Sequence, residues 1–126
     1  MMRATLLLAP VLALTLVATP AAAGKLLEAA PEAMRSYAEQ AGYLLASIAV
    51  CGGDAEEEDY FRGIATDNLV QLGADDEDLG FLEHHMEQAA RSARPKKRDC
   101  DEEGAVPVAS ELFLHRNTIE QALKGR

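Results

Sequence analysis

The residues best suited to hold a metal ion form one short run, Glu83-His84-His85-Met86-Glu87. Imidazole, thioether and carboxylate groups are ligands for copper and zinc. In a helix, successive residues are about 100° apart, so Met86 points into the apolar stripe, His85 lies at its edge and His84 points almost directly away. The two histidines therefore do not readily bind one ion. His84 and Glu87 are three positions apart and lie on one face. They are therefore the candidate metal ligands, although two ligands do not close a site and a solvated helix face explains the same residues.

Two acidic clusters, Asp54–Asp59 and Asp75–Asp78, raise the question of calcium. Residues 75–86 can be aligned with the twelve-residue loop of an EF-hand. The alignment fails at the fifth position, which is Leu79, and at the twelfth, where Met86 replaces the bidentate glutamate. Both clusters lie at the starts of predicted helices, where acids stabilise the helix dipole. The sequence therefore favours helix starts over a calcium site.

No combination of side chains points to catalysis. His115 lies on or beside the apolar stripe of the last predicted helix, where a histidine with one hydrogen bond is the simpler interpretation. No serine, histidine and aspartate can be combined from their spacing, and both cysteines are better assigned to a disulfide. Acidic residues are too abundant for a carboxylate pair to be specific. We expect a protein that is not an enzyme, and the sequence indicates no catalytic residue and no cofactor.

One aromatic residue, Phe81, falls well off the apolar stripe of its predicted helix and near His85. Such a side chain either covers a neighbouring helix or anchors a partner. Tyr43 and Phe113 present the same two alternatives. Phe81 is therefore a candidate partner contact, with a place in a broad core as the alternative.

Four helices follow from capping residues and apolar spacing. The first begins near Pro31, since proline is well tolerated in a first turn, and Gly52-Gly53 ends it. The second begins at Asp54, with Glu57 in capping-box position, and ends at Gly73. Residues 24–30 either add a helical turn before these elements or lie loose.

The third helix starts just after Asp75 and ends before Pro95. A charged loop of residues 96–106 follows, and the last helix runs from about Pro107 to Lys124. Apolar residues recur at intervals of three and four along each helix. The stripe residues are Met34, Tyr37, Ala41, Leu44, Ile48 and Cys51 in the first helix, and Phe61, Ala65, Asn68 or Leu69, and Leu72 in the second. They are Leu79, Leu82, Met86, Ala89 or Ala90, and Ala93 in the third helix, and Leu112, His115 or Arg116, Ile119, and Ala122 or Leu123 in the last.

The two cysteines, Cys51 and Cys100, are expected to form a disulfide within the chain. On the chain-entropy model, a bridge that closes so long a loop contributes about 4 kcal/mol to stability. The spacing places Cys51 on the buried face at the end of the first helix. The expected fold class is thus all-α, a small bundle of about four helices closed by one disulfide.

The first 23 residues have the pattern of a secretory signal peptide. A short basic region with Arg3 precedes a nearly unbroken apolar run, Leu6–Val17, and Ala21 and Ala23 fit the small-residue cleavage rule. The run is shorter than the roughly 20 residues that span a bilayer, so we expect no membrane span after cleavage. The prediction is a signal peptide over residues 1–23 and one helical domain over 24–126, exported most simply to a periplasm, with an extracellular location as the alternative.

The charge balance indicates the kind of partner. The whole chain carries a net charge of −9, and residues 1–23 hold one basic residue and no acidic one, so residues 24–126 carry −10. The one basic run, from Arg91 to Arg98, is flanked by acids and lacks aromatic residues, so nucleic-acid binding is not expected. Protein partners with basic surfaces fit this charge. The sequence leaves the oligomeric state open.

In overall layout, residues 24–126 resemble the small periplasmic acid-stress chaperones, which are also short, helical and closed by one long-loop disulfide. The resemblance is architectural and carries no specific motif, and the chain departs from that group in its high acidity. It implies an exported protein that acts by contact with other proteins, as a chaperone-like or envelope accessory factor. The alternative from a different class is a weak metal-binding or metal-buffering protein that uses His84 and Glu87.

Overall fold

The computed structural model describes residues 24–100 and 102–125, and the predicted signal peptide lies outside these ranges. Within them the chain is helical and contains no strand. The elements are α2 (Lys25–Ala29), α3 (Pro31–Val50), α4 (Ala55–Gln71), α5 (Asp76–Ser92), the 3-10 helix η2 (Lys97–Cys100) and α6 (Glu102–Lys124). The predicted fold class, a small all-α bundle closed by one disulfide, is confirmed.

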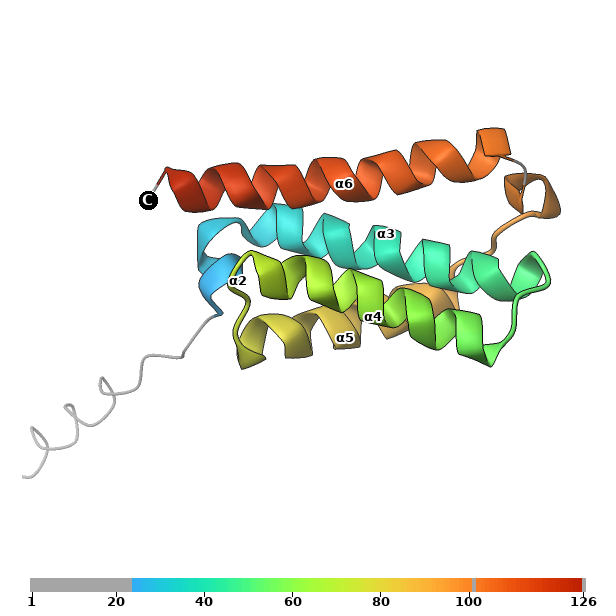
Figure 1. The fold of residues 1–126 in the computed structure, drawn as a ribbon, viewed down its shortest axis with the longest axis horizontal. Helices are drawn as coiled ribbons and strands as arrows, with labels where there is room; N and C mark the ends of the chain where they lie inside the picture. The colour runs from blue at the N-terminus through green and yellow to red at the C-terminus, as the bar shows by residue number, and fades with distance from the viewer. Residues whose placement is uncertain (1–23, 101, 126) are drawn as a thin grey trace, which may run out of the picture.

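The helix α3 is the centre of the bundle, with α6 along one side and α4 and α5 along the other (Figure 1). The chain reverses direction between α3 and α4 and again between α4 and α5, so α3 and α5 run in the same direction (Figure 1). The helix α6 returns antiparallel to α3. Because α3 meets helices on more than one side, it buries more of its surface than the stripe of a surface helix would.

Most of the predicted stripe residues are buried or pack against the core, but in α3 the core also takes in Ala33, Ala38 and Leu45, which lie off the predicted stripe. Tyr37 is fully buried and donates a hydrogen bond from its hydroxyl to the backbone oxygen of Ala65, at 2.7 Å, which ties α3 to α4. Burial raises the pKa of the Tyr37 phenol above its ordinary value of 10.0. The short helix α2 adds Leu26 to the core. The other buried apolar side chains are Ala30, Ala33, Met34, Ala38, Ala41, Leu45, Ala65, Leu69, Leu82, Met86, Leu112 and Ile119.

Small residues bring α3 and α5 close together. A Cβ atom added at Gly42 would lie 2.5 Å from the Cβ of Ala89 and 2.5 Å from the backbone oxygen of Met86. The glycine therefore does not serve a special backbone conformation here. It removes the side chain that would separate the two helices, as small residues do wherever backbones approach closely.

The predicted helix starts and stops are largely as expected. Pro31 occupies the first turn of α3, and Gly52 and Gly73 follow α3 and α4 with positive φ angles of 90° and 96°. Asp54 accepts a hydrogen bond from the backbone N–H of Glu57 at 3.0 Å, which is one half of the predicted capping box. A complete capping box occurs one helix later, at the start of α5.

The disulfide joins Cys51 to Cys100, as predicted, with 5.5 Å between the two Cα atoms. The prediction that Cys51 lies on the buried face is wrong, because both cysteines are exposed. Cys51 follows the last residue of α3, and its partner belongs to η2, which lies at the end of the bundle (Figure 1). The bridge therefore closes the end of the bundle from outside the core.

The last helix is longer than predicted. It begins at Glu102, not near Pro107, so residues 102–106 of the expected loop are helical, and residues 97–100 form η2. The prediction relied on the preference of proline for a first helical turn, whereas Pro107 is the sixth residue of α6, and the helix continues through it at the cost of one backbone hydrogen bond. Among the described residues, no helix has the length and apolar character needed to cross a membrane.

We predict opposite effects for alanine at three glycines. Gly42→Ala should lower the free energy of unfolding by about 1–3 kcal/mol, because the new Cβ overlaps α5. Gly63→Ala and Gly80→Ala should raise it by about 0.5–1 kcal/mol each, since both glycines are inside helices and face open space. Urea unfolding followed by circular dichroism measures all three, and a Gly42→Ala protein as stable as the original would contradict the close approach.

Candidate functional site

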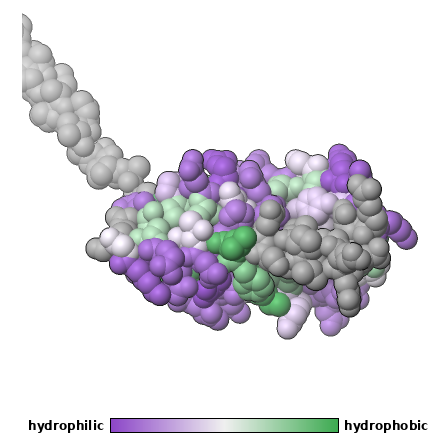
Figure 2. Space-filling model, turned by 90° about the horizontal axis from the view of Figure 1, so that it is seen from above, coloured by the Kyte–Doolittle hydropathy of each residue, from purple (hydrophilic) through white to green (hydrophobic). Residues whose placement is uncertain are grey.

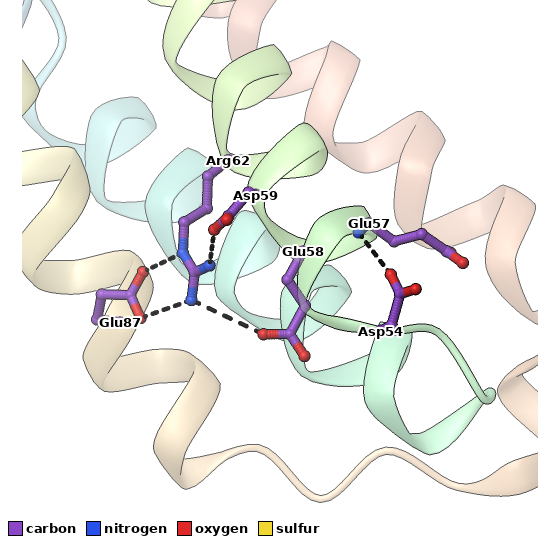
Figure 3. Close-up of polar contacts among 6 residues, drawn as sticks. All are labelled: Asp54, Glu57, Glu58, Asp59, Arg62 and Glu87. Carbon is purple, nitrogen blue, oxygen red and sulfur yellow. Dashed lines mark hydrogen bonds and ion pairs between the residues drawn. The ribbon is translucent and has the colours of Figure 1, made fainter.

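The carboxylate of the candidate metal ligand Glu87 is bound by the guanidinium of an arginine, Arg62. Its Oε2 lies 2.8 Å from Nε of Arg62, and its Oε1 lies 3.3 Å from Nη2 of the same guanidinium. Arg62 also binds Asp59 at 3.0 Å, and Glu58 lies at 4.0 Å (Figure 3). The hydrogen bond that Arg62 donates to Glu87 is the main cause that raises the pKa of Arg62 above its ordinary value. This bidentate pair links α4 to α5.

The other candidate, His84, is exposed on the same side of α5 and helps to line a groove of about 540 Å³ between α4 and α5. Arg62 and Arg91 line this groove as well. Their positive charges oppose the binding of a metal cation there. Among the described residues, no three histidine, cysteine, aspartate or glutamate side chains are placed to hold a metal ion together. The structure brings His84 and Glu87 to one groove but supplies no third ligand.

The candidate partner contact, Phe81, is half-buried and packs against the core. Its ring centroid lies 4.1 Å from that of His85, with the planes tilted by 42°. Burial lowers the pKa of His85 below its ordinary 6.5, and the nearby charge of Arg35 lowers it further. The Phe81 ring thus makes much of its contact within the protein.

A groove of about 480 Å³ lies between α3 and α5, beside His85. Arg35 and Glu39 line it from α3, together with Tyr43, and Gln88 and Ser92 line it from α5. These groups carry mixed charge and hydrogen-bonding capacity. His115, on α6, is half-buried and does not line this groove.

The most buried polar group among the described residues is the carboxylate of Asp78, which is 0% exposed. It accepts hydrogen bonds from the backbone N–H groups of Leu26 and Leu27, each at 3.0 Å, and from that of Asp75 at 3.1 Å. Asp75 in turn accepts from the N–H of Asp78 and, through its other oxygen, from the N–H of Lys25 at 3.0 Å. Asp75 and Asp78 of the second acidic cluster, which was considered for calcium, therefore bind backbone N–H groups at the start of α2.

Sequence reasoning placed Asp78 only in the first turn of its helix. The spacing of Asp75 and Asp78 could have predicted the capping box, since it matches the reciprocal pattern with Asp in place of Glu. The contact with Leu26 spans 52 positions, and no local pattern encodes it.

An apolar strip on the outside of α4 was also missed. Tyr60 is 73% exposed and Ile64, one turn later, is 40% exposed. Glu57, Gly63 and Asp67 are exposed beside them on the same side of the helix. We call these five residues the outer face of α4. Asp54, Glu56 and Glu57 line a depression of about 340 Å³ next to Tyr60.

Two more apolar side chains are exposed on α6, Phe113 at 54% and Leu114 at 61%. Seen from the α6 side, apolar surface is interspersed with strongly hydrophilic surface (Figure 2). Phe113 is therefore a surface residue, which decides the alternative left open by its spacing.

A comparison with known proteins finds no family model, no curated protein and no solved structure that matches this chain.

We predict that the attachment of α2 weakens in acid. Hydrogen bonds from the backbone N–H groups of Asp78 and Lys25 lower the pKa of Asp75 below its ordinary 3.8. A lowered folded-state pKa contributes stability that is present above the unfolded value and is lost as the pH falls through the folded value. The protection factor of the Lys25 amide, which is its exchange rate relative to that of an unstructured peptide at the same pH, should therefore fall below about pH 4. In Asp75→Asn this protection should be low already at pH 7, and a protection factor that stays constant below pH 4 in the unmodified protein would contradict the role of Asp75.

Proposed function

We propose that this protein is exported and acts without catalysis, by binding a protein partner that presents basic and apolar side chains to the outer face of α4. The observation that carries the proposal is the exposure of Tyr60 and Ile64, one turn apart on a helix whose exposed neighbours are acids. An apolar strip with a charged rim is the usual composition of a protein contact surface.

The geometry around Tyr60 suits a lysine or arginine from the partner. The face of an aromatic ring attracts a cation, and carboxylates at its edge add charge pairing. Asp54, Glu56 and Glu57 line the depression beside the ring. Gly63 contributes no side chain and a Cβ there would meet nothing within 4 Å, so a partner can approach the helix backbone closely between Tyr60 and Ile64.

The charge of the whole domain favours the same class of partner. Residues 24–126 carry a net charge of −10, and such a field attracts basic surfaces and accelerates their association. A strongly acidic surface also opposes contact between copies of this chain, so a partner of opposite charge fits better than self-association.

Export rests on the sequence of residues 1–23 and is supported by the disulfide. The apolar run and the alanines before Gly24 fit a secretory signal peptide. A disulfide between Cys51 and Cys100 is compatible with an oxidising compartment, such as a periplasm or the extracellular space. We place the protein in a periplasm, with the extracellular space as the alternative.

The metal-buffering alternative has less support from the geometry. Its best carboxylate, Glu87, binds Arg62 through both oxygens, and a metal ion would have to displace that cation. No described residue adds a third ligand beside His84.

We predict that the outer face of α4 binds an amphipathic peptide of lysine and leucine, measured by calorimetry at low ionic strength. A Tyr60→Ser, Ile64→Ser double variant should bind it about tenfold more weakly, because about 1.4 kcal/mol of apolar and cation–π contact is lost. Raising the salt concentration should weaken binding to both proteins.

Val70→Ser is the matched control for this measurement. Val70 is on the same helix and 48% exposed, but it lies six residues beyond Ile64 and about 120° from it around the helix axis. Its replacement should leave the affinity unchanged. Equal affinity of the double variant and the original protein, or an equal loss in Val70→Ser, contradicts the proposed surface.

The acid-stress form of this function has its own expected outcome. At about pH 3, below the ordinary carboxyl pKa values, most of the 21 acidic residues are neutral and the net charge becomes positive. Binding of an apolar dye should then rise, and aggregation of an acid-denatured client protein should fall when this protein is added. No change in either measurement rules out the acid-stress form while leaving contact at neutral pH intact.

A further inference from the structure

The buried carboxylate of Asp78 lacks a countercharge. It is 0% exposed, and among the described residues no lysine, arginine or histidine forms an ion pair with it. Its bonds come from neutral backbone N–H groups of Leu26, Leu27 and Asp75. A buried carboxylate is costly unless a cation compensates it.

The nearest lysine along the chain is directed elsewhere. The Nζ of Lys25 lies 3.2 Å from the position that a Cβ would occupy at Gly73, in the turn between α4 and α5. Lys25 contributes its backbone N–H to Asp75 and does not bring its ammonium group to Asp78. Among the described residues no side chain therefore supplies a cation to Asp78, and neutral backbone N–H groups at the starts of α2 and α5 alone stabilise its charge.

The residue in direct contact with this carboxylate is Gly24. It is buried, and a Cβ added to it would overlap Oδ1 and Cγ of Asp78 and lie 2.8 Å from the backbone nitrogen of Asp78. The φ angle of Gly24 is −64°, which any residue adopts, so glycine is required here by the close contact alone. Gly24 is also the first residue after the predicted cleavage position.

We propose, on the basis of the export proposed above, that cleavage between Ala23 and Gly24 gives Gly24 a free ammonium group that pairs with Asp78. A signal peptidase adds one water to this peptide bond, which leaves a carboxylate on Ala23 and an amine, protonated at neutral pH, on Gly24. The new charge supplies the cation that Asp78 lacks. Removal of the leader thereby completes the polar anchor that holds α2 on α5.

The ion pair depends on the cut being made at this bond. One additional residue moves the ammonium group by up to about 3.8 Å and restores a neutral amide next to Asp78. Asp75, whose Oδ2 accepts from the N–H of Lys25, adds a second negative charge beside the same site. Both carboxylates belong to one capping box, so the charge on residue 24 and the start of α5 stabilise each other.

The first measurement is the intact mass of the full chain after expression and export with its own leader. We expect a mass that corresponds to residues 24–126 with the disulfide formed. An exported protein that begins at another residue overturns the inference and leaves export intact. A chain that keeps residues 1–23 and stays in the cytoplasm overturns export, and the ion pair is then decided by the comparison of purified forms that follows.

The second measurement compares the melting temperatures of the mature protein and of the same protein with one additional N-terminal alanine. The additional alanine should lower the melting temperature by several degrees in the original sequence and in Asp76→Asn, an exposed acid of the same turn that serves as control. In Asp78→Asn it should have no further effect. Equal melting temperatures of the two forms of the original protein overturn the inference.

Asp78→Asn also removes an acceptor of several N–H groups and can destabilise the protein for that reason alone. A chemical test in the original sequence therefore accompanies this variant. Transamination with pyridoxal phosphate transfers the terminal amino group to that reagent, converts the N-terminal glycine to an uncharged glyoxylyl aldehyde and leaves the lysines intact. It should lower the melting temperature of the form that begins at Gly24 and leave the alanine-extended form unchanged. A melting temperature that transamination does not alter in the Gly24 form overturns the ion pair.

Discussion

The packing of α3 against helices on more than one side is the constraint on which the rest of the structure depends. Its contact with α5 requires Gly42, because a side chain at that position would overlap the backbone of α5. The hydroxyl of Tyr37 fixes α4 on the same helix. With α3 enclosed in this way, the described core consists mainly of alanine, leucine and methionine, with Tyr37 as its one fully buried aromatic side chain, and the chain has no tryptophan. Close approach of small residues therefore fills much of the core.

Polar contacts and the disulfide link helices in addition to the apolar packing of the core. Arg62 links the outer parts of α4 and α5 through Glu87, and Asp78 attaches the short helix α2 to the start of α5. The disulfide joins the ends of α3 and η2 outside the core. These links lie at different places on the bundle, so each holds a separate segment. A chain with this many acids can fold because several of them cap helices or bind arginine, while the remainder stay in solvent.

The surface differs from the interior in the side chains that it offers to other molecules. Among the described residues, no three metal-ligating side chains are placed together. The exterior carries exposed apolar side chains on α4 and α6 within an acidic surface. In the function that we propose, the net charge selects which surfaces approach the domain, and Tyr60 and Ile64 supply the contact.

The sequence by itself determined the helices, most of their ends, the buried stripes and the disulfide partners. It could do so because each follows from local spacing, from the backbone preferences of glycine and proline, or from a choice between only two cysteines. Tertiary structure alone decided that Cys51 is exposed, that Glu87 binds Arg62, that Tyr60 faces solvent and that Asp78 holds the start of α2. Helical periodicity fixes which residues share a face but not which neighbour covers it. The direction in which each helix meets α3 therefore determined which acids became buried anchors and which apolar side chains remained exposed.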